Sequence, residues 1–160
     1  MDLLDYPVRI CVAGSRSWHN AYLFDICLRV FLSWAGAKQK YALISGDAWR
    51  GPDRLAIEWA EEHSVSCFTF PADWDGLGKA AGHIRNAEMR KVLTHLLVFW
   101  DGESRGTKEM IENTQKQGIH VSVILVKPDQ WWLDYQERRK ARFSANRFKA
   151  RHHEWKPQGS

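Results

Sequence analysis

The sequence predicts an α/β domain with a mostly parallel sheet, followed by a C-terminal helical arm rich in basic residues. Two observations carry this prediction. Short apolar segments of strand length alternate with segments of helical periodicity as far as residue 126, an order typical of parallel sheets with crossover helices. Pro128 then precedes a segment of different composition. We therefore expect a three-layer Rossmann-like domain over residues 1–127 and an aromatic and basic arm over residues 128–160.

Five segments have the composition of buried strands. The first spans residues 8–13 and is apolar apart from Arg9, as expected of a strand that helices cover on both sides of the sheet. The remaining strands are expected over residues 41–45, 65–70, 96–100 and 120–126.

Helices are expected between these strands. Apolar residues recur at helical spacing in the first helix, and Gly36 is placed to end it. These residues are Leu23, Ile26, Cys27, Val30, Phe31 and Trp34. The second helix begins at Pro52 or Asp53, since both suit a first helical turn. Its apolar face consists of Leu55, Ala56, Trp59 and Ala60.

The second half of the domain predicts two more helices. Residues 72–82 have no clear periodicity, so we expect a loop that crosses the edge of the sheet, followed by a helix over residues 84–93. The last helix of the domain has Met110, Ile111 and Thr114 on its inner face and ends at Gly118.

A strand, a glycine-bearing turn and a helix start occur together twice. Gly14-Ser15-Arg16 follows the first strand, and a turn with Gly102 and Gly106 follows the strand at 96–100. Glycine lets the backbone approach a ligand closely, and the N–H groups and dipole of a helix start favour phosphate or carboxylate. Both turns follow the carboxyl ends of parallel strands, where such sheets bind ligands. Together they predict one anion site.

Arginine and tryptophan residues fall in or beside the same loops. The arginines, whose planar guanidinium groups suit phosphate or carboxylate, are Arg16, Arg50, Arg85 and Arg105. The alternative for each is a solvated surface position. The tryptophans are Trp18, Trp49, Trp74 and Trp100. Trp18 or Trp74 is a candidate platform for a base or ribose, with packing in the core as the alternative.

Acidic residues in these loops have structural alternatives to a role in catalysis. They are Asp47, Asp53, Asp73, Asp75, Glu88, Asp101 and Glu109. Asp53 suits a first helical turn, Asp101 suits a turn cap, and Glu88 is spaced to pair with Arg85 on one helix face. The sequence contains no Ser/His/Asp order, HExxH or Walker pattern, and His63 and His83 lack spaced partners. We expect no metal site and no separate cofactor.

Composition indicates an intracellular protein. Cys11, Cys27 and Cys67 lack metal-binding spacing and sit among apolar neighbours, which favours free thiols in a reducing cytosol. No segment is long and apolar enough for a membrane span, and the first residues are acidic where a signal peptide is basic. We therefore expect a cytoplasmic location and no membrane partner.

Positive charge is concentrated in the arm. The chain has a net charge of +4, and residues 137–156 hold eight Lys or Arg and two acids. Any affinity for polyanions therefore belongs to the arm, where basic residues alternate with Phe143, Phe148 and Trp155. The alternative is a solvated helix face. At the start of the arm we expect Trp131, Trp132 and Tyr135 to pack on the domain or on a second subunit.

Five blocks of sequence, in this order, resemble the YspA-like branch of the SLOG superfamily, which is related to the SMF/DprA and Lonely Guy proteins. The blocks are Gly14-Ser15-Arg16-Ser17-Trp18, Ser45 to Ala48 continuing through Gly51 to Ala56, Pro71 to Trp74, Gly78 to Asn86 with Met89, and Ser104 to Thr107. The resemblance spans residues 8–126. It implies a Rossmann-like site for a nucleotide or nucleotide-derived ligand, with phosphate at Gly106 and Thr107 and the other end near Gly14 and Arg16.

The resemblance does not imply catalysis. Lonely Guy enzymes hydrolyse the N-glycosidic bond of nucleoside monophosphates with the glutamate of a PGGxGTxxE motif, and Met110 stands at that position here. Glu109 is one residue away, which turns it about 100° around a helix. The loop after the second strand also differs from the family pattern. Trp49 resembles an insertion in this loop, and Asp47 and Pro52 stand where many relatives have small residues.

We expect a nucleotide-ligand-binding domain that acts as a sensor, a sequestering protein or a signalling component. The expected ligand contacts are Gly14, Ser15, Arg16, Trp18, Gly46, Asp47, Asp53, Asp73, Trp74, Arg85, Asn86, Gly102, Ser104, Arg105, Gly106 and Thr107. One alternative is a nucleotide N-glycosidase or phosphoribohydrolase that uses Glu88, Glu109 or Asp101. The other is nucleic-acid binding through the arm. Formation of a homo-oligomer is left open.

Overall fold

The structure of the protein is a computed structural model. It describes residues 1–38 and 40–151, and for residues 146 and 148–151 the backbone alone. Trp155 and Lys156 of the predicted arm therefore lie outside the described residues, as do the side chains of Phe148, Lys149 and Arg151.

A five-stranded parallel sheet forms the centre of the domain. Its strands are β1 (Val8–Gly14), β2 (Tyr41–Ser45), β3 (Cys67–Thr69), β4 (His95–Trp100) and β5 (His120–Leu125), in the order β3-β2-β1-β4-β5. All four neighbouring pairs are parallel. The pairs Val12–Ser45 and Gly14–Phe99 bring the carboxyl ends of β1, β2 and β4 to one edge. The predicted parallel sheet is confirmed.

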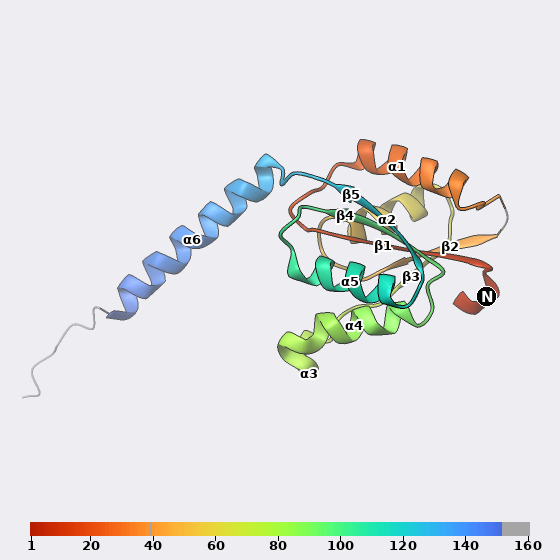
Figure 1. Cartoon of the computed structure of the whole chain (residues 1–160). Helices are drawn as coiled ribbons and strands as arrows, with labels where there is room; N and C mark the ends of the chain where they lie inside the picture. Colours follow the sequence, from red (N-terminus) through yellow and green to blue (C-terminus); the bar gives the residue numbers. More distant parts are fainter. Residues whose placement is uncertain (39, 152–160) are drawn as a thin grey trace, which may run out of the picture.

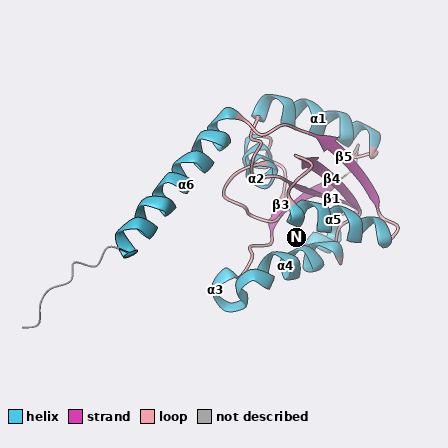
Figure 2. Cartoon of the chain, turned by 60° about the vertical axis from the view of Figure 1, so that its left-hand side comes forward, coloured by secondary structure: helices cyan, strands magenta, loops and turns pink. Residues whose placement is uncertain are grey.

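Helices cover both faces of the sheet (Figures 1 and 2). On one face α1 (Ala21–Trp34) and α2 (Pro52–Glu62) bury Phe24, Leu28 and Leu55 against the sheet. On the other face α4 (Ala81–Arg90) and α5 (Arg105–Lys116) bury Met89 and Met110. A 3₁₀ turn at Leu3–Asp5 precedes β1. The three-layer Rossmann-like arrangement predicted from the sequence is therefore correct.

Only part of the apolar pattern noted for α1 in the sequence is buried. Phe24, Leu28 and Phe31 are its buried residues, whereas Leu23, Ile26, Val30 and Trp34 are exposed. The helix is apolar over more than half of its circumference, so periodicity alone does not choose between two overlapping stripes. Contacts with α2 and the sheet decide which stripe is buried.

The second half of the domain differs in detail from the expectation. The segment predicted as a loop contains α3 (Trp74–Leu77) and a 3₁₀ turn at Gly78–Ala80, and α4 begins at Ala81, three residues earlier than expected. These two elements are short, which explains why they show no periodicity. The inner face of α5 was predicted correctly, since Met110, Ile111 and Thr114 are buried.

A long helix, α6 (Gln130–Arg151), follows the domain and extends away from it (Figure 1). Asp129 caps its start by accepting a hydrogen bond from the N–H of Trp132 at 3.0 Å. Among the described residues, no helix combines the length and the apolar character needed to cross a membrane.

Candidate functional site

A cavity of about 470 Å³ opens at the carboxyl edge of the sheet. This volume lies within the range of pockets that hold small molecules and cofactors. Its walls come from the loops after β1, β2 and β3, from α4, and from the first turn of α5. The lining residues are Ala13, Gly14, Arg16, Gly46, Asp47, Ala48, Trp49, Asp53, Pro71, Ala72, Trp74, Lys79, Gly82, His83, Arg85, Asn86, Met89, Ser104, Arg105, Gly106, Thr107 and Met110.

The two glycine turns that the sequence predicts are hydrogen-bonded to each other. The N–H of Ser15 donates to the carbonyl of Phe99 at 2.9 Å, and the Ser15 hydroxyl accepts from the N–H of Asp101 at 3.1 Å. Gly14 makes this approach possible, because a Cβ there would collide with the carbonyl of Phe99 and with Pro52. The turns after β1 and β4 therefore form one rigid unit at the sheet edge.

The first turn of α5 opens into the cavity with an uncapped start. Ser104 is the N-cap residue, but its hydroxyl pairs with that of Thr107 at 3.0 Å and makes no capping bond to the backbone. The first N–H groups of a helix have no carbonyl partner within it, so they are available to an anion. A Cβ added at Gly106 would meet no other atom within 4 Å, which leaves this turn open to a ligand.

Asp101 holds the turn before α5 and does not line the cavity. Its carboxylate accepts hydrogen bonds from the N–H groups of Glu103 and Ser104, each at 2.9 Å, and from the Ser17 hydroxyl at 2.7 Å. Partial burial opposes ionisation, but these hydrogen bonds prevail and keep the pKa of Asp101 below its ordinary value. Asp101 therefore caps this turn, which is the structural role that the sequence suggested as the alternative to catalysis.

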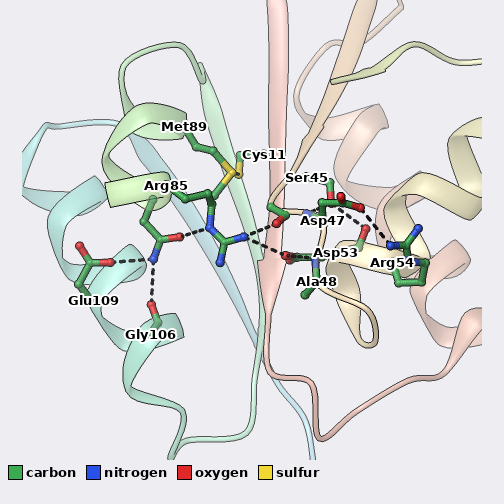
Figure 3. Close-up of polar contacts among 12 residues, drawn as sticks. Cys11, Ser45, Asp47, Ala48, Asp53, Arg54, Arg85, Met89, Gly106 and Glu109 are labelled. Atoms are coloured by element: carbon green, nitrogen blue, oxygen red, sulfur yellow. Dashed lines mark hydrogen bonds and ion pairs between the residues drawn. The ribbon is translucent and has the colours of Figure 1, made fainter. Parts of the chain in front are cut away.

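Arg85 links α4 to the loop after β2 (Figure 3). Its guanidinium donates to the carbonyl of Gly46 and lies 4.0 Å from the carboxylate of Asp53. Gly46 has no room for a side chain, because a Cβ there would lie 2.7 Å from Asp53 and closer still to Arg85. Burial raises the pKa of Asp53 to about 6, although the charge of Arg85 opposes the shift. The cavity wall thus contains a buried carboxyl group whose negative charge is only partly balanced by Arg85.

Glu109 supports Asn86 and lies behind the cavity wall. It accepts hydrogen bonds from the side-chain amides of Asn86 and Asn113, each at 2.8 Å, and from Arg90 at 2.9 Å. Partial burial opposes ionisation, yet these donors and the charge of Arg90 keep the pKa of Glu109 below its ordinary value. Met110, the next residue, is buried and lines the cavity in its place.

Most of the predicted ligand contacts converge on this cavity. Those that line it are Gly14, Arg16, Gly46, Asp47, Asp53, Trp74, Arg85, Asn86, Ser104, Arg105, Gly106 and Thr107. Ser15, Trp18, Asp73 and Gly102 are absent from the lining. Sequence reasoning overlooked Lys79 and His83 as site residues, although both stand in the block Gly78 to Asn86 that carries the family resemblance.

Several predicted residues have other roles. Trp18 is 6% exposed and stacks on Phe99 with 4.8 Å between ring centroids, so it belongs to the core and is no platform for a base. Asp73 caps α3 by accepting from the N–H of Gly76. Glu88 pairs with Lys91 at 2.7 Å, and the predicted pair with Arg85 does not form, because Arg85 turns toward Asp53.

Arg50 is not available to a ligand. It is buried and donates to the carbonyl of Arg16, and its other terminal nitrogen donates to both carboxylate oxygens of Asp129 at 2.6 and 2.7 Å. This partner is far away in the sequence and belongs to the segment that precedes α6. Arg50 therefore connects the arm to the two loops that carry Arg16 and Trp49.

Comparison with known proteins identifies the family of this chain. The sequence model of the YspA, cpYpsA-related SLOG family matches residues 8–76. The chain is also 34% identical over 121 residues to the Gene 61 protein of Mycobacterium phage D29, covering 71% of this chain and 93% of that protein. The chain belongs to this SLOG family. No solved structure matches it.

The segment that matches the SLOG family model includes part of the cavity lining. The matched segment contains β1, β2, β3 and the connections that follow them, and it includes the cavity residues Gly14, Gly46 and Trp74. The start of α5, which completes the cavity, lies beyond the matched residues. Family membership suggests binding or processing of nucleotide-related ligands without specifying one.

Proposed function

We propose that this protein binds a nucleotide or a nucleotide-derived phosphate ligand in the cavity at the carboxyl edge of the sheet, as a sensor, a sequestering protein or a signalling component. The observation that carries the proposal is the uncapped start of α5 in a cavity with an excess of basic side chains. The cationic residues in the lining are Arg16, Lys79, Arg85 and Arg105, and the anionic ones are Asp47 and Asp53.

The two ends of the cavity suit two parts of such a ligand. A phosphate at Gly106 and Thr107 meets free N–H groups and the positive end of the α5 dipole. Gly14 and Arg16 also line the cavity, and the remainder of the ligand would extend toward them. Gly106→Val tests this orientation, because a branched side chain blocks the approach to the backbone, and a Cβ at this position meets no neighbouring atom within 4 Å.

Isothermal titration calorimetry with a panel of mono-, di- and cyclic nucleotides measures the binding affinity of wild type and of Gly106→Val. Wild type is expected to bind at least one of them, and Gly106→Val to bind none. Thr114→Ser, a conservative change on the buried side of α5, serves as the control. Equal binding by wild type and Gly106→Val would refute the proposed phosphate position.

Hydrolysis of a nucleotide N-glycosidic bond is the alternative function, and Asp53 favours it. Glu88, Glu109 and Asp101 do not line the cavity, whereas Asp53 does and has a pKa raised to about 6 by burial. A carboxyl group with such a pKa suits general acid–base work near neutral pH. Asp47 also lines the cavity but pairs with Arg54 at 3.0 Å.

Base release from common nucleoside monophosphates and NAD distinguishes the two functions. We expect slow or undetectable release, because Met110 stands where the resembled hydrolases have glutamate. Met110→Glu is expected to raise any activity. Wild-type turnover on the order of 10 per second, an ordinary enzyme rate, would overturn the non-enzymatic proposal.

Nucleic-acid binding through α6 is a second alternative, supported by the exposure of its basic residues. Arg138, Arg139, Lys140, Arg142 and Arg147 are all exposed. Binding to single strands would depend on phosphate contacts, so log K would fall against log salt with a slope of about −0.7 per phosphate. Fluorescence polarisation of full-length protein and of a form ending after Tyr135, across a salt series, tests this. Equal binding, or no binding, in both proteins would show that the arm beyond Tyr135 does not bind nucleic acid.

We also propose a cytoplasmic site of action. Its support is that Cys11, Cys27 and Cys67 are free thiols, as expected in a reducing compartment.

A further inference from the structure

We infer that Trp49 is the surface on which the base of the ligand stacks, so that the site selects nucleotides over sugar phosphates without a base. This inference rests on the proposed function. Trp49 lines the cavity and is 50% exposed, which leaves a large part of its ring available to a ligand. An aromatic base offers a flat face to such a ring, and stacking of this kind accepts any base.

Aromatic residues of α6 pack against Trp49. Its ring centroid lies 6.1 Å from that of Trp131, 6.3 Å from that of Trp132 and 5.8 Å from that of Tyr135. The rings of Trp131 and Tyr135 stack on each other at 5.3 Å with 9° between their planes. Trp49 thus lines the cavity and also contacts three aromatic rings of the arm.

The start of α6 is itself fixed to the domain by partly buried contacts. Arg50, next to Trp49, pairs with Asp129, and its guanidinium carbon lies 4.6 Å from the ring centroid of Trp131. Asp129 also accepts from the N–H of His19 at 3.0 Å and donates its own N–H to the carbonyl of Ser17. These contacts restrict Trp49 before a ligand arrives, so less conformational entropy is lost on binding.

The position of Trp49 fits a ligand whose phosphate lies at α5. Trp49 follows β2 and the start of α5 follows β4, and these strands lie on either side of β1. Two strand spacings separate their ends by about 10 Å. A mononucleotide extends over a comparable length from its phosphate to its base.

Trp74 also lines the cavity, but it is less well placed as a platform. It is 59% exposed, belongs to a helix of four residues, and has no aromatic partner among the described residues. Its ring is therefore less restricted than that of Trp49. Trp49 is the better base platform because three rings fix it.

Paired titrations with AMP and ribose 5-phosphate test the inference. These probes share the phosphate and the ribose, and they differ by the base. Wild type is expected to bind AMP about tenfold more tightly than ribose 5-phosphate, or better, from the range measured for base stacking on aromatic side chains. Trp49→Ala is expected to remove that difference by weakening AMP alone, and Trp49→Phe to retain most of it.

Three further variants make the result specific. Tyr135→Ala removes a support of Trp49 and is expected to weaken AMP binding in part, whereas Trp34→Ala is the control and is expected to leave the AMP preference intact. Trp74→Ala tests the competing platform by whether AMP is still bound more tightly than ribose 5-phosphate. Trp34 is exposed on α1 and does not line the cavity. Melting temperatures confirm that each variant is folded.

The outcomes separate the inference from the function on which it rests. If wild type binds neither probe nor any other nucleotide, the proposed function fails. If wild type binds both probes equally, or if Trp49→Ala keeps the AMP preference, the base platform at Trp49 is wrong while phosphate binding stands. Loss of the preference in Trp74→Ala alone would move the platform to Trp74.

Discussion

Arg85 is the residue that connects most parts of the site. It contacts the carbonyl of Gly46, faces Asp53 and lines the cavity from α4. Gly46 permits this arrangement because it has no side chain. The same guanidinium therefore has a structural role in the loop after β2 and a proposed role toward the ligand.

Arg85→Ala is expected to weaken nucleotide binding strongly. A charge-assisted hydrogen bond contributes roughly 1.5–3 kcal/mol, and the loop at Gly46 also loses a contact. Calorimetry against the nucleotide that binds wild type measures the loss. Arg29→Ala, an exposed arginine on α1 paired with Asp25, is the control and is expected to bind normally. Normal binding by Arg85→Ala would show that Arg85 does not contact the ligand.

Asp53 makes stability depend on pH in a predictable direction. Its folded-state pKa of about 6 lies above its ordinary value because of burial. The folded protein keeps this proton between about pH 4 and pH 6 while the unfolded chain loses it, so stability falls as pH rises through that window. Above pH 6 the ionised carboxylate costs the folded state about 2–3 kcal/mol.

Asp53→Asn is expected to remove this contribution. The variant should be more stable than wild type at pH 7, and the difference should shrink below pH 4, where the wild-type carboxyl group is neutral in both states. Urea unfolding at several pH values from 4 to 7.5 measures the two curves. Parallel curves across that range would contradict the assignment of a raised pKa to Asp53.

Among the structural elements, α6 stands out because, in the part of the helix whose side chains are described, the first turns hold it to the domain. Asp129 holds Arg50, caps α6 and binds the N–H of His19, while Trp131, Trp132 and Tyr135 pack around Trp49. The predicted packing of these three aromatic residues on the domain is confirmed. Beyond them the helix carries exposed basic residues, whose partners stay a prediction.

Asp129→Ala is expected to destabilise the protein by about 3 kcal/mol, because it leaves the buried guanidinium of Arg50 without its carboxylate. Thermal unfolding measures the change. Glu137→Ala removes the exposed pair with Lys140 on the same helix and is expected to change stability by less than about 1 kcal/mol. Equal effects of the two variants would show that Arg50 does not depend on Asp129.

For the molecule as a whole, the sequence predicted the layers and the edge of the sheet at which the cavity opens. Strand composition and the two glycine turns were sufficient, because parallel strands bring their carboxyl ends together. Contacts between residues that are far apart in the sequence could not be predicted. Nothing local indicated that Asp129 would engage Arg50, that Trp18 would stack on Phe99, or which stripe of α1 would be buried. Formation of a homo-oligomer stays a prediction.

Binding of a nucleotide phosphate at the start of α5 can be tested by a thermal-shift screen of wild type and Gly106→Val against mono-, di- and cyclic nucleotides. A ligand at a hundredfold excess over Kd stabilises a protein by about 2.7 kcal/mol, which corresponds to a rise in Tm of about 5 to 10 °C for a domain of this size. We expect such a rise for at least one nucleotide with wild type and none with Gly106→Val. No rise with wild type, or the same rise in both proteins, would contradict phosphate binding at this turn.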